Sequence, residues 1–130
     1  MASELYWLTL TVLMTALFWI PYVLERMVAN GLWPTLAGTY QPARPGWAER
    51  AIKAHGNAVE NLVLFAPAVL VAHAVGVSTP ATQAAAAVYF FARLTHFAVY
   101  VLGVPVVRTL AFAAGWAALI VIVASVLGWR

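Results

Sequence analysis

The chain has 130 residues, of which 65% are hydrophobic and only 8% are charged, which excludes an ordinary soluble domain and indicates one polytopic membrane domain. The net charge is only +3 and the basic residues are scattered, so no nucleic-acid partner is expected. The sequence contains no cysteine, which excludes disulfides, a thiolate nucleophile and cysteine-based metal sites.

The first predicted membrane span covers about residues 5–28. Its core, residues 5–24, carries no charge, and threonines are the polar residues that interrupt its first half. We expect Pro21 to kink this helix near its end, because proline lacks the backbone N–H that an α-helix needs. Residues 30–46 are rich in glycine and proline, a composition that predicts the one substantial loop.

Three further spans are predicted over residues 47–75, 81–103 and 106–128. The connections between them are short, and Ser78 or Thr79 is expected to cap the third helix. Four spans joined in this way predict an all-α fold, an integral membrane four-helix up-and-down bundle. The whole 130-residue chain then forms a single membrane domain.

Basic residues near the span ends predict the orientation of the bundle. They surround the first loop and begin the fourth span, whereas only Arg130 lies at the opposite face. The basic residues in question are Arg26, Arg44, Arg50, Lys53 and Arg108. Because cytoplasmic loops carry an excess of Lys and Arg, both termini are expected on the non-cytoplasmic side.

A polar stripe interrupts the second apolar span. At a helical step of about 100° per residue, Lys53, Asn57 and Glu60 fall on one side of that helix. Polar side chains within a membrane span cost free energy unless they face partners or a cavity. We therefore interpret these three residues as candidate binding residues.

The third predicted helix carries a matching stripe at positions i, i+3 and i+7, formed by Arg93, His96 and Tyr100. Counted from the turn between the two helices, Glu60 and Arg93 lie at similar depth, offset by about 4.5 Å. Arg108 lies at the same end, in the first turn of the fourth helix. The helix dipole is positive there and disfavours an arginine unless an anion neutralises both charges.

These stripes converge on one pocket facing the cytoplasm, and its excess of positive charge predicts a small anionic ligand. Taken alone, a Glu60–Arg93 pair is equally consistent with a structural ion pair in the membrane. His55 and His73 lie off the stripes and are expected to be packing residues. Three scattered histidines do not predict a metal site.

Two segments match the signatures of a known family. The first, residues 53–61, has the sequence KAHGNAVEN, and the second, residues 92–100, has the sequence ARLTHFAVY. They resemble the basic-Ala-His-x-Asn-x-x-Glu-Asn and Ala-Arg-x-x-His-x-x-x-Tyr motifs of the MAPEG proteins, the membrane-associated proteins of eicosanoid and glutathione metabolism. The segment from Pro105 to Arg108 resembles the start of their fourth helix. The chain resembles a bacterial-type member of this family that is similar to microsomal glutathione transferase.

The resemblance implies a homotrimer in a bacterial inner membrane, with glutathione as co-substrate bound between neighbouring subunits on the cytoplasmic side. By position in the motifs, it implies a glutathione site lined by Lys53, Asn57, Glu60, Arg93, His96 and Tyr100. Arg108 matches the arginine that stabilises the glutathione thiolate electrostatically in catalytic members. The chain departs from many eukaryotic members at Gly56 and Ala58, where those proteins carry polar or acidic side chains.

The resemblance thus implies a membrane-bound glutathione transferase or glutathione-dependent peroxidase that acts on lipophilic electrophiles. Its expected partners are glutathione, a lipophilic small molecule, membrane lipid and further copies of itself. One alternative is a non-catalytic family member that binds lipid or scaffolds a partner. The other is a small multidrug transporter, which would need a carboxylate within the first helix, where residues 5–24 have none.

Overall fold

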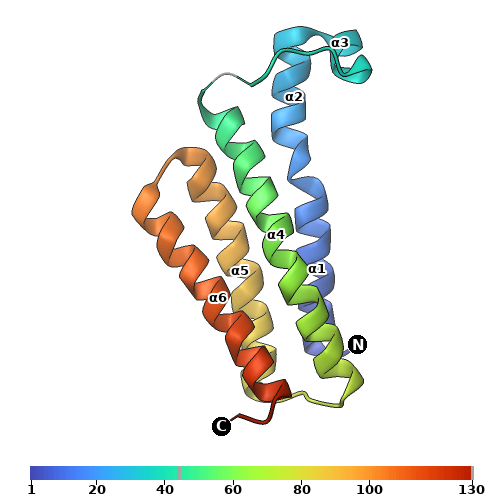
Figure 1. Ribbon diagram of the computed structural model, residues 1–130, viewed down its shortest axis with the longest axis vertical. Helices are drawn as coiled ribbons and strands as arrows, with labels where there is room; N and C mark the ends of the chain where they lie inside the picture. Colours follow the sequence, from blue (N-terminus) through green and yellow to red (C-terminus); the bar gives the residue numbers. More distant parts are fainter. Residues whose placement is uncertain (44, 130) are drawn as a thin grey trace.

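The computed structural model describes residues 1–43 and 45–129, and within them it consists of helices without strands (Figure 1). The helices are α1 (Ser3–Leu17), α2 (Trp19–Asn30), α3 (Leu32–Ala37), α4 (Trp47–Ala74), α5 (Pro80–Leu102) and α6 (Pro105–Val126). Four stretches are long and apolar enough to cross a membrane, namely Ser3–Asn30, Trp47–Ala74, Pro80–Leu102 and Pro105–Val126. The predicted all-α membrane fold is therefore confirmed.

The first span is interrupted at Phe18, between α1 and α2. Pro21, three residues after Phe18, accounts for this interruption, because it has no N–H to donate to the carbonyl of Leu17. The N–H of Phe18 donates to the carbonyl of Thr15, three residues earlier, at 3.3 Å, so the last turn of α1 is tighter than an α-helical turn. The expected interruption by Pro21 is present, whereas α4 continues through Pro67 as one helix.

The segment predicted as a loop contains α3, a helix that the sequence did not predict. Two contacts fold the chain after α3 back onto α2. The backbone N–H of Gln41 donates to Oδ1 of Asn30 at 3.1 Å, and the Arg26 guanidinium carbon lies 3.8 Å from the centroid of the Tyr40 ring. Six residues that include a proline carry too little periodicity to indicate a helix.

The turn between α4 and α5 is fixed by hydroxyl side chains. Thr79 is the N-cap of α5, and it exchanges hydrogen bonds with Thr82 in a capping box. Glu4 of α1 accepts hydrogen bonds from the Ser78 hydroxyl at 2.9 Å and the Thr82 hydroxyl at 2.7 Å. The sequence correctly predicted a cap at this turn, and the structure adds that the turn holds the start of α1.

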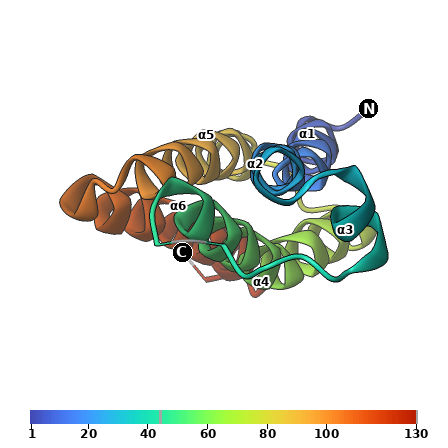
Figure 2. The same ribbon diagram turned by 90° about the horizontal axis from the view of Figure 1, so that it is seen from above.

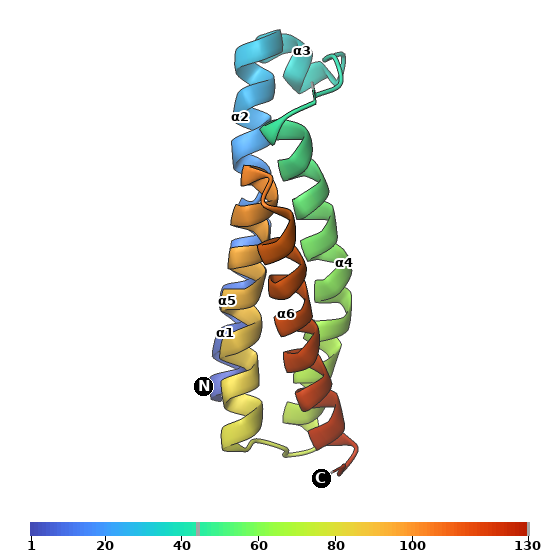
Figure 3. The ribbon, with the colours of Figure 1, turned by 90° about the vertical axis from the view of Figure 1, so that its left-hand side faces the viewer.

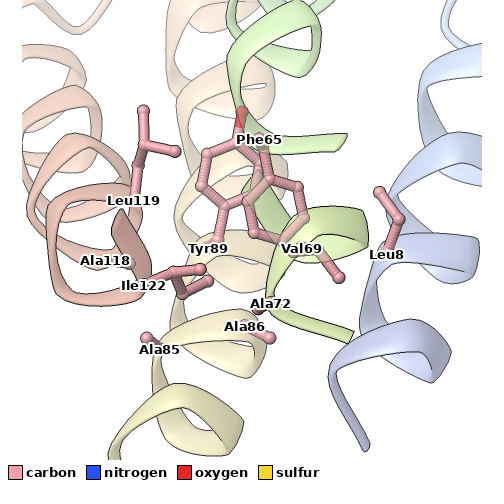
Figure 4. Packing of buried hydrophobic residues seen from close by; sticks show 10 residues of the cluster. All are labelled: Leu8, Phe65, Val69, Ala72, Ala85, Ala86, Tyr89, Ala118, Leu119 and Ile122. Carbon is pink, nitrogen blue, oxygen red and sulfur yellow. The ribbon is translucent and has the colours of Figure 1, made fainter. Parts of the chain in front are cut away.

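Helices α4 and α5 each pack against both α1 and α6 (Figure 2). On α4, small residues at helical spacing, including Ala51, Ala54 and Ala58, form the buried seam. Deeper in the bundle, the Phe65 ring of α4 stacks on the Tyr89 ring of α5, with centroids 3.7 Å apart (Figure 4). Alanines supply much of the packed interior, whereas many bulky apolar side chains lie on the outside. This distribution is expected for a surface that faces lipid.

The start of α1 and the end of α6 lie at the same end of the bundle, opposite α3 and the corner between α5 and α6 (Figures 1 and 3). This is the arrangement expected of an up-and-down bundle with four spans. The side of the membrane on which the termini lie stays a prediction. Two of the residues behind that prediction, Arg44 and Arg130, lie outside the described residues.

Candidate functional site

Arg93 is the central polar residue of the bundle interior. It is only 3% exposed, and its guanidinium Nη2 donates a hydrogen bond to Oδ1 of Asn57 on α4. Its aliphatic part packs against α6, where a Cβ added to Gly115 would lie 3.5 Å from Cδ of Arg93. Asn61 donates to the backbone carbonyl of Asn57 at 2.8 Å and so fixes this turn of α4. The contact with Asn57 joins the two polar stripes predicted from the sequence.

The expected pairing of Arg93 with Glu60 does not form within the described chain. Arg93 contacts Asn57 instead, which lies almost one helical turn away from Glu60 along α4. Asn57 borders the buried seam of α4 beside Ala58, whereas Glu60 is exposed on the outer face. Depth matching predicts which residues lie at a similar height, but a long arginine side chain can reach a different turn of α4, here that of Asn57.

Lys53 and Glu60 both lie on the outside of the helix bundle. The Lys53 ammonium is 3.4 Å from a carboxylate oxygen of Glu49, one turn earlier on the same helix, and this is the one ion pair among the described residues. An exposed pair of this kind contributes little stability, typically about 0–1 kcal/mol. Lys53 and Glu60 therefore lie on the exposed surface of α4, while Asn57, between them in the sequence, is half-buried.

His96, Tyr100 and Arg108 form a second contact group at the end of α5 that faces α6. His96 is 3% exposed, and its ring centroid lies 5.6 Å from that of Tyr100 and 6.2 Å from that of Phe112. The guanidinium carbon of Arg108 lies 4.7 Å from the centroid of the Tyr100 ring, a cation–π distance. Pro105 is the first residue of α6, so Arg108 lies in its N-terminal turn as predicted.

Three buried polar atoms have no hydrogen-bonding partner among the described residues. They are Tyr89 Oη, Arg93 Nε and His96 Nδ1. An unpaired buried donor or acceptor typically costs about 1–3 kcal/mol, so these atoms favour the binding of a polar group. All three belong to one face of α5, at i, i+4 and i+7. Tyr89 was missed from the sequence, although its position four residues before Arg93 places it on the same face.

His55 lies away from this group, as expected. Its Nδ1 shares a hydrogen bond of 2.8 Å with the Tyr22 hydroxyl of α2, and the Phe18 ring lies edge-on to it. His55 therefore packs against the Phe18–Tyr22 segment, whereas His73, which was also expected to be a packing residue, is exposed. The polar groups that remain are rich in cations and N–H donors, a set that suits an anionic ligand.

The MAPEG family model matches residues 5–128, a range that contains both polar segments, three of the spans and all but the first two residues of the span Ser3–Asn30. No curated protein and no solved structure matches the chain. The family match extends over almost the whole chain and agrees with the helical membrane fold described above. We conclude that this protein belongs to the MAPEG family.

Proposed function

We propose that this protein is a homotrimeric membrane glutathione transferase or glutathione-dependent peroxidase that acts on lipophilic electrophiles. Membership of the MAPEG family is consistent with such glutathione-dependent chemistry. The residues that the sequence assigned to the site supply the charges and hydrogen-bonding groups that this ligand requires.

The observation that carries the proposal is the position of Arg108. Its guanidinium lies over the Tyr100 ring in the first turn of α6, and no carboxylate of the described residues forms an ion pair with it. A helix N-terminus is itself equivalent to about half a positive charge. Two positive potentials in one place favour an anion, and the glutathione thiolate is an anion of suitable size.

The stripe on α4 supplies groups for the rest of the peptide. Lys53 is suited to a carboxylate, Glu60 to an ammonium group, and the side chain of Asn57 to a peptide group. A carboxylate such as Glu60 on the outside of a membrane span needs a polar partner. A glutathione molecule held against a neighbouring subunit provides that partner, which supports the trimer and an inter-subunit site.

The lipophilic electrophile requires an apolar surface close to the sulfur. An apolar groove of about 460 Å³ runs between α5 and α6, and Val107, next to Arg108, lines one end of it. Phe91, Thr95 and Leu110 line other parts of this groove. In transfer, the thiolate sulfur bonds to the electrophilic carbon, the leaving group departs with the bonding electron pair, and the thiol proton passes to solvent.

The test uses purified protein with glutathione and either an aromatic halide or an organic hydroperoxide. We expect turnover by wild type, and we expect Arg108→Ala to slow it by about 10²–10³-fold, the usual effect of removing one positioned electrostatic group. Arg26→Met is the matched control, because it removes an arginine that contacts Tyr40 rather than Tyr100. Wild-type protein that binds glutathione without a thiolate signal and without turnover would instead support a non-catalytic role.

A further inference from the structure

The corner between α5 and α6 determines where Arg108 lies relative to Tyr100. Helix α5 ends at Leu102 and α6 begins at Pro105, so only two residues connect them. Gly103 adopts the left-handed conformation with φ of 77°, which favours glycine. A small movement of so short a corner would displace Arg108 from the Tyr100 ring.

One backbone carbonyl at this corner has no partner within its own helix. In a continuous helix the carbonyl of Val101 would accept from the N–H of residue 105, but that residue is Pro105 and has no N–H. The guanidinium Nε of Arg50 donates to this carbonyl at 2.9 Å. Arg50 belongs to the first turns of α4 and is half-buried.

The Arg50 guanidinium also packs against the glycine of the corner. A Cβ added to Gly103 would lie 3.4 Å from Nε and 3.5 Å from Cζ of Arg50, so the group rests directly on the turn. A planar guanidinium can lie flat on a backbone turn and still direct its Nε–H at a carbonyl, which a lysine ammonium cannot reproduce. Arg50 therefore joins α4 to the corner through both a hydrogen bond and close packing.

We propose that Arg50 is a positioning residue that holds the α5–α6 corner against α4 and thereby sets Arg108 over the Tyr100 ring. Arg50 affects turnover only by holding this corner, and that effect rests on the function proposed above. The fixed corner itself does not depend on that function. The two parts of the proposal can therefore be tested separately.

The corner is tested by hydrogen–deuterium exchange without glutathione. In the folded protein the N–H groups of Gly103 and Val104 donate to the carbonyls of Tyr100 at 3.1 Å and Val99 at 2.9 Å. Arg50→Met should accelerate exchange of these two amides by at least about tenfold, as expected for loss of a hydrogen bond to a charged group. Arg50→Lys should give an intermediate rate, and it serves as the second variant if Arg50→Met does not fold.

The control for exchange is Arg26→Met, which removes a positive charge at the same end of the bundle and should leave both amides unchanged. Exchange at Gly103 and Val104 that is equal in wild type, Arg50→Met and Arg50→Lys would overturn the proposal. Wild-type protein without turnover would refute the proposed function, and the exchange result would still decide whether Arg50 holds the corner.

The link to chemistry is tested with a double-mutant cycle. Arg50→Met should lower kcat with little change in KM for glutathione, because the peptide contacts on α4 remain. In the Arg108→Ala background the same substitution should cause less than about a twofold further loss, since residues that act through one another are not additive. Losses that multiply in the double variant would show that Arg50 does not act through Arg108.

Discussion

The contact between Arg93 and Asn57 gives a prediction whose size follows from the structure. Asn57→Leu removes the acceptor for a guanidinium that is only 3% exposed. A hydrogen bond to a charged group contributes about 1.5–3 kcal/mol, and the stranded charge adds a desolvation penalty. We therefore expect Asn57→Leu to lower the free energy of unfolding by at least about 2 kcal/mol.

Arg93→Met should cost less than Asn57→Leu, because it removes the charge together with its requirement for a partner. The methionine stem retains the packing against Gly115, and the amide oxygen of Asn57 keeps Asn61 as a donor at 3.3 Å. The double variant should be less destabilised than the sum of the two single variants, since both remove the same interaction.

The assay is unfolding of the purified protein in detergent without glutathione, followed by circular dichroism for the wild type, both single variants and the double variant. Equal stability of wild type and Asn57→Leu would refute the assignment of Asn57 as the acceptor for Arg93. A larger loss for Arg93→Met than for Asn57→Leu would contradict the argument from the stranded charge.

Three further substitutions test the contacts of Glu4, Gly115 and Lys53. Glu4→Leu, which removes the carboxylate that accepts from the Ser78 and Thr82 hydroxyls, should lower stability by about 1–3 kcal/mol, while glutathione affinity measured by calorimetry stays unchanged. Gly115→Leu should overpack the contact with Arg93 and cost about 1–3 kcal/mol in the same unfolding assay, and Gly115→Ala should cost less because its Cβ fits at 3.5 Å. Lys53→Ala should weaken glutathione binding by about tenfold without lowering stability by more than about 0.5 kcal/mol, since its partner Glu49 lies at the surface, and an unchanged dissociation constant would remove Lys53 from the site.

The sequence predicted the spans and several local features because these depend on neighbouring residues. Length and hydropathy locate the helices, Pro21 determines the interruption of the first span, and Thr79 provides the cap of α5. The position of Arg108 in the first turn of α6 likewise follows from Pro105 alone. Each of these features is set within about one or two helical turns.

The partners of the polar side chains could not be predicted in the same way. Counting residues from a turn gives the height of Arg93 in the bundle, but it does not give the direction in which a long side chain extends. Glu4 lies at the start of the first span, where a charged residue simply marks the end of an apolar segment. Its hydrogen bond with Ser78, 74 residues later, follows only from the fold. Arg50 looked like a charge that sets topology, because its carbonyl partner is 51 residues away in the chain.

The most direct test of the proposed chemistry is the pH dependence of the thiolate absorbance when glutathione is mixed with the protein. A free thiol of this type has a pKa of about 8.5, and a cation at a helix N-terminus should lower it. We predict that wild type forms the thiolate with a midpoint well below pH 8, and that Arg108→Ala binds glutathione but returns the midpoint to about pH 8.5. A wild-type midpoint equal to that of free glutathione, or one that Arg108→Ala leaves unchanged, would contradict the assignment of Arg108 as the group that stabilises the thiolate.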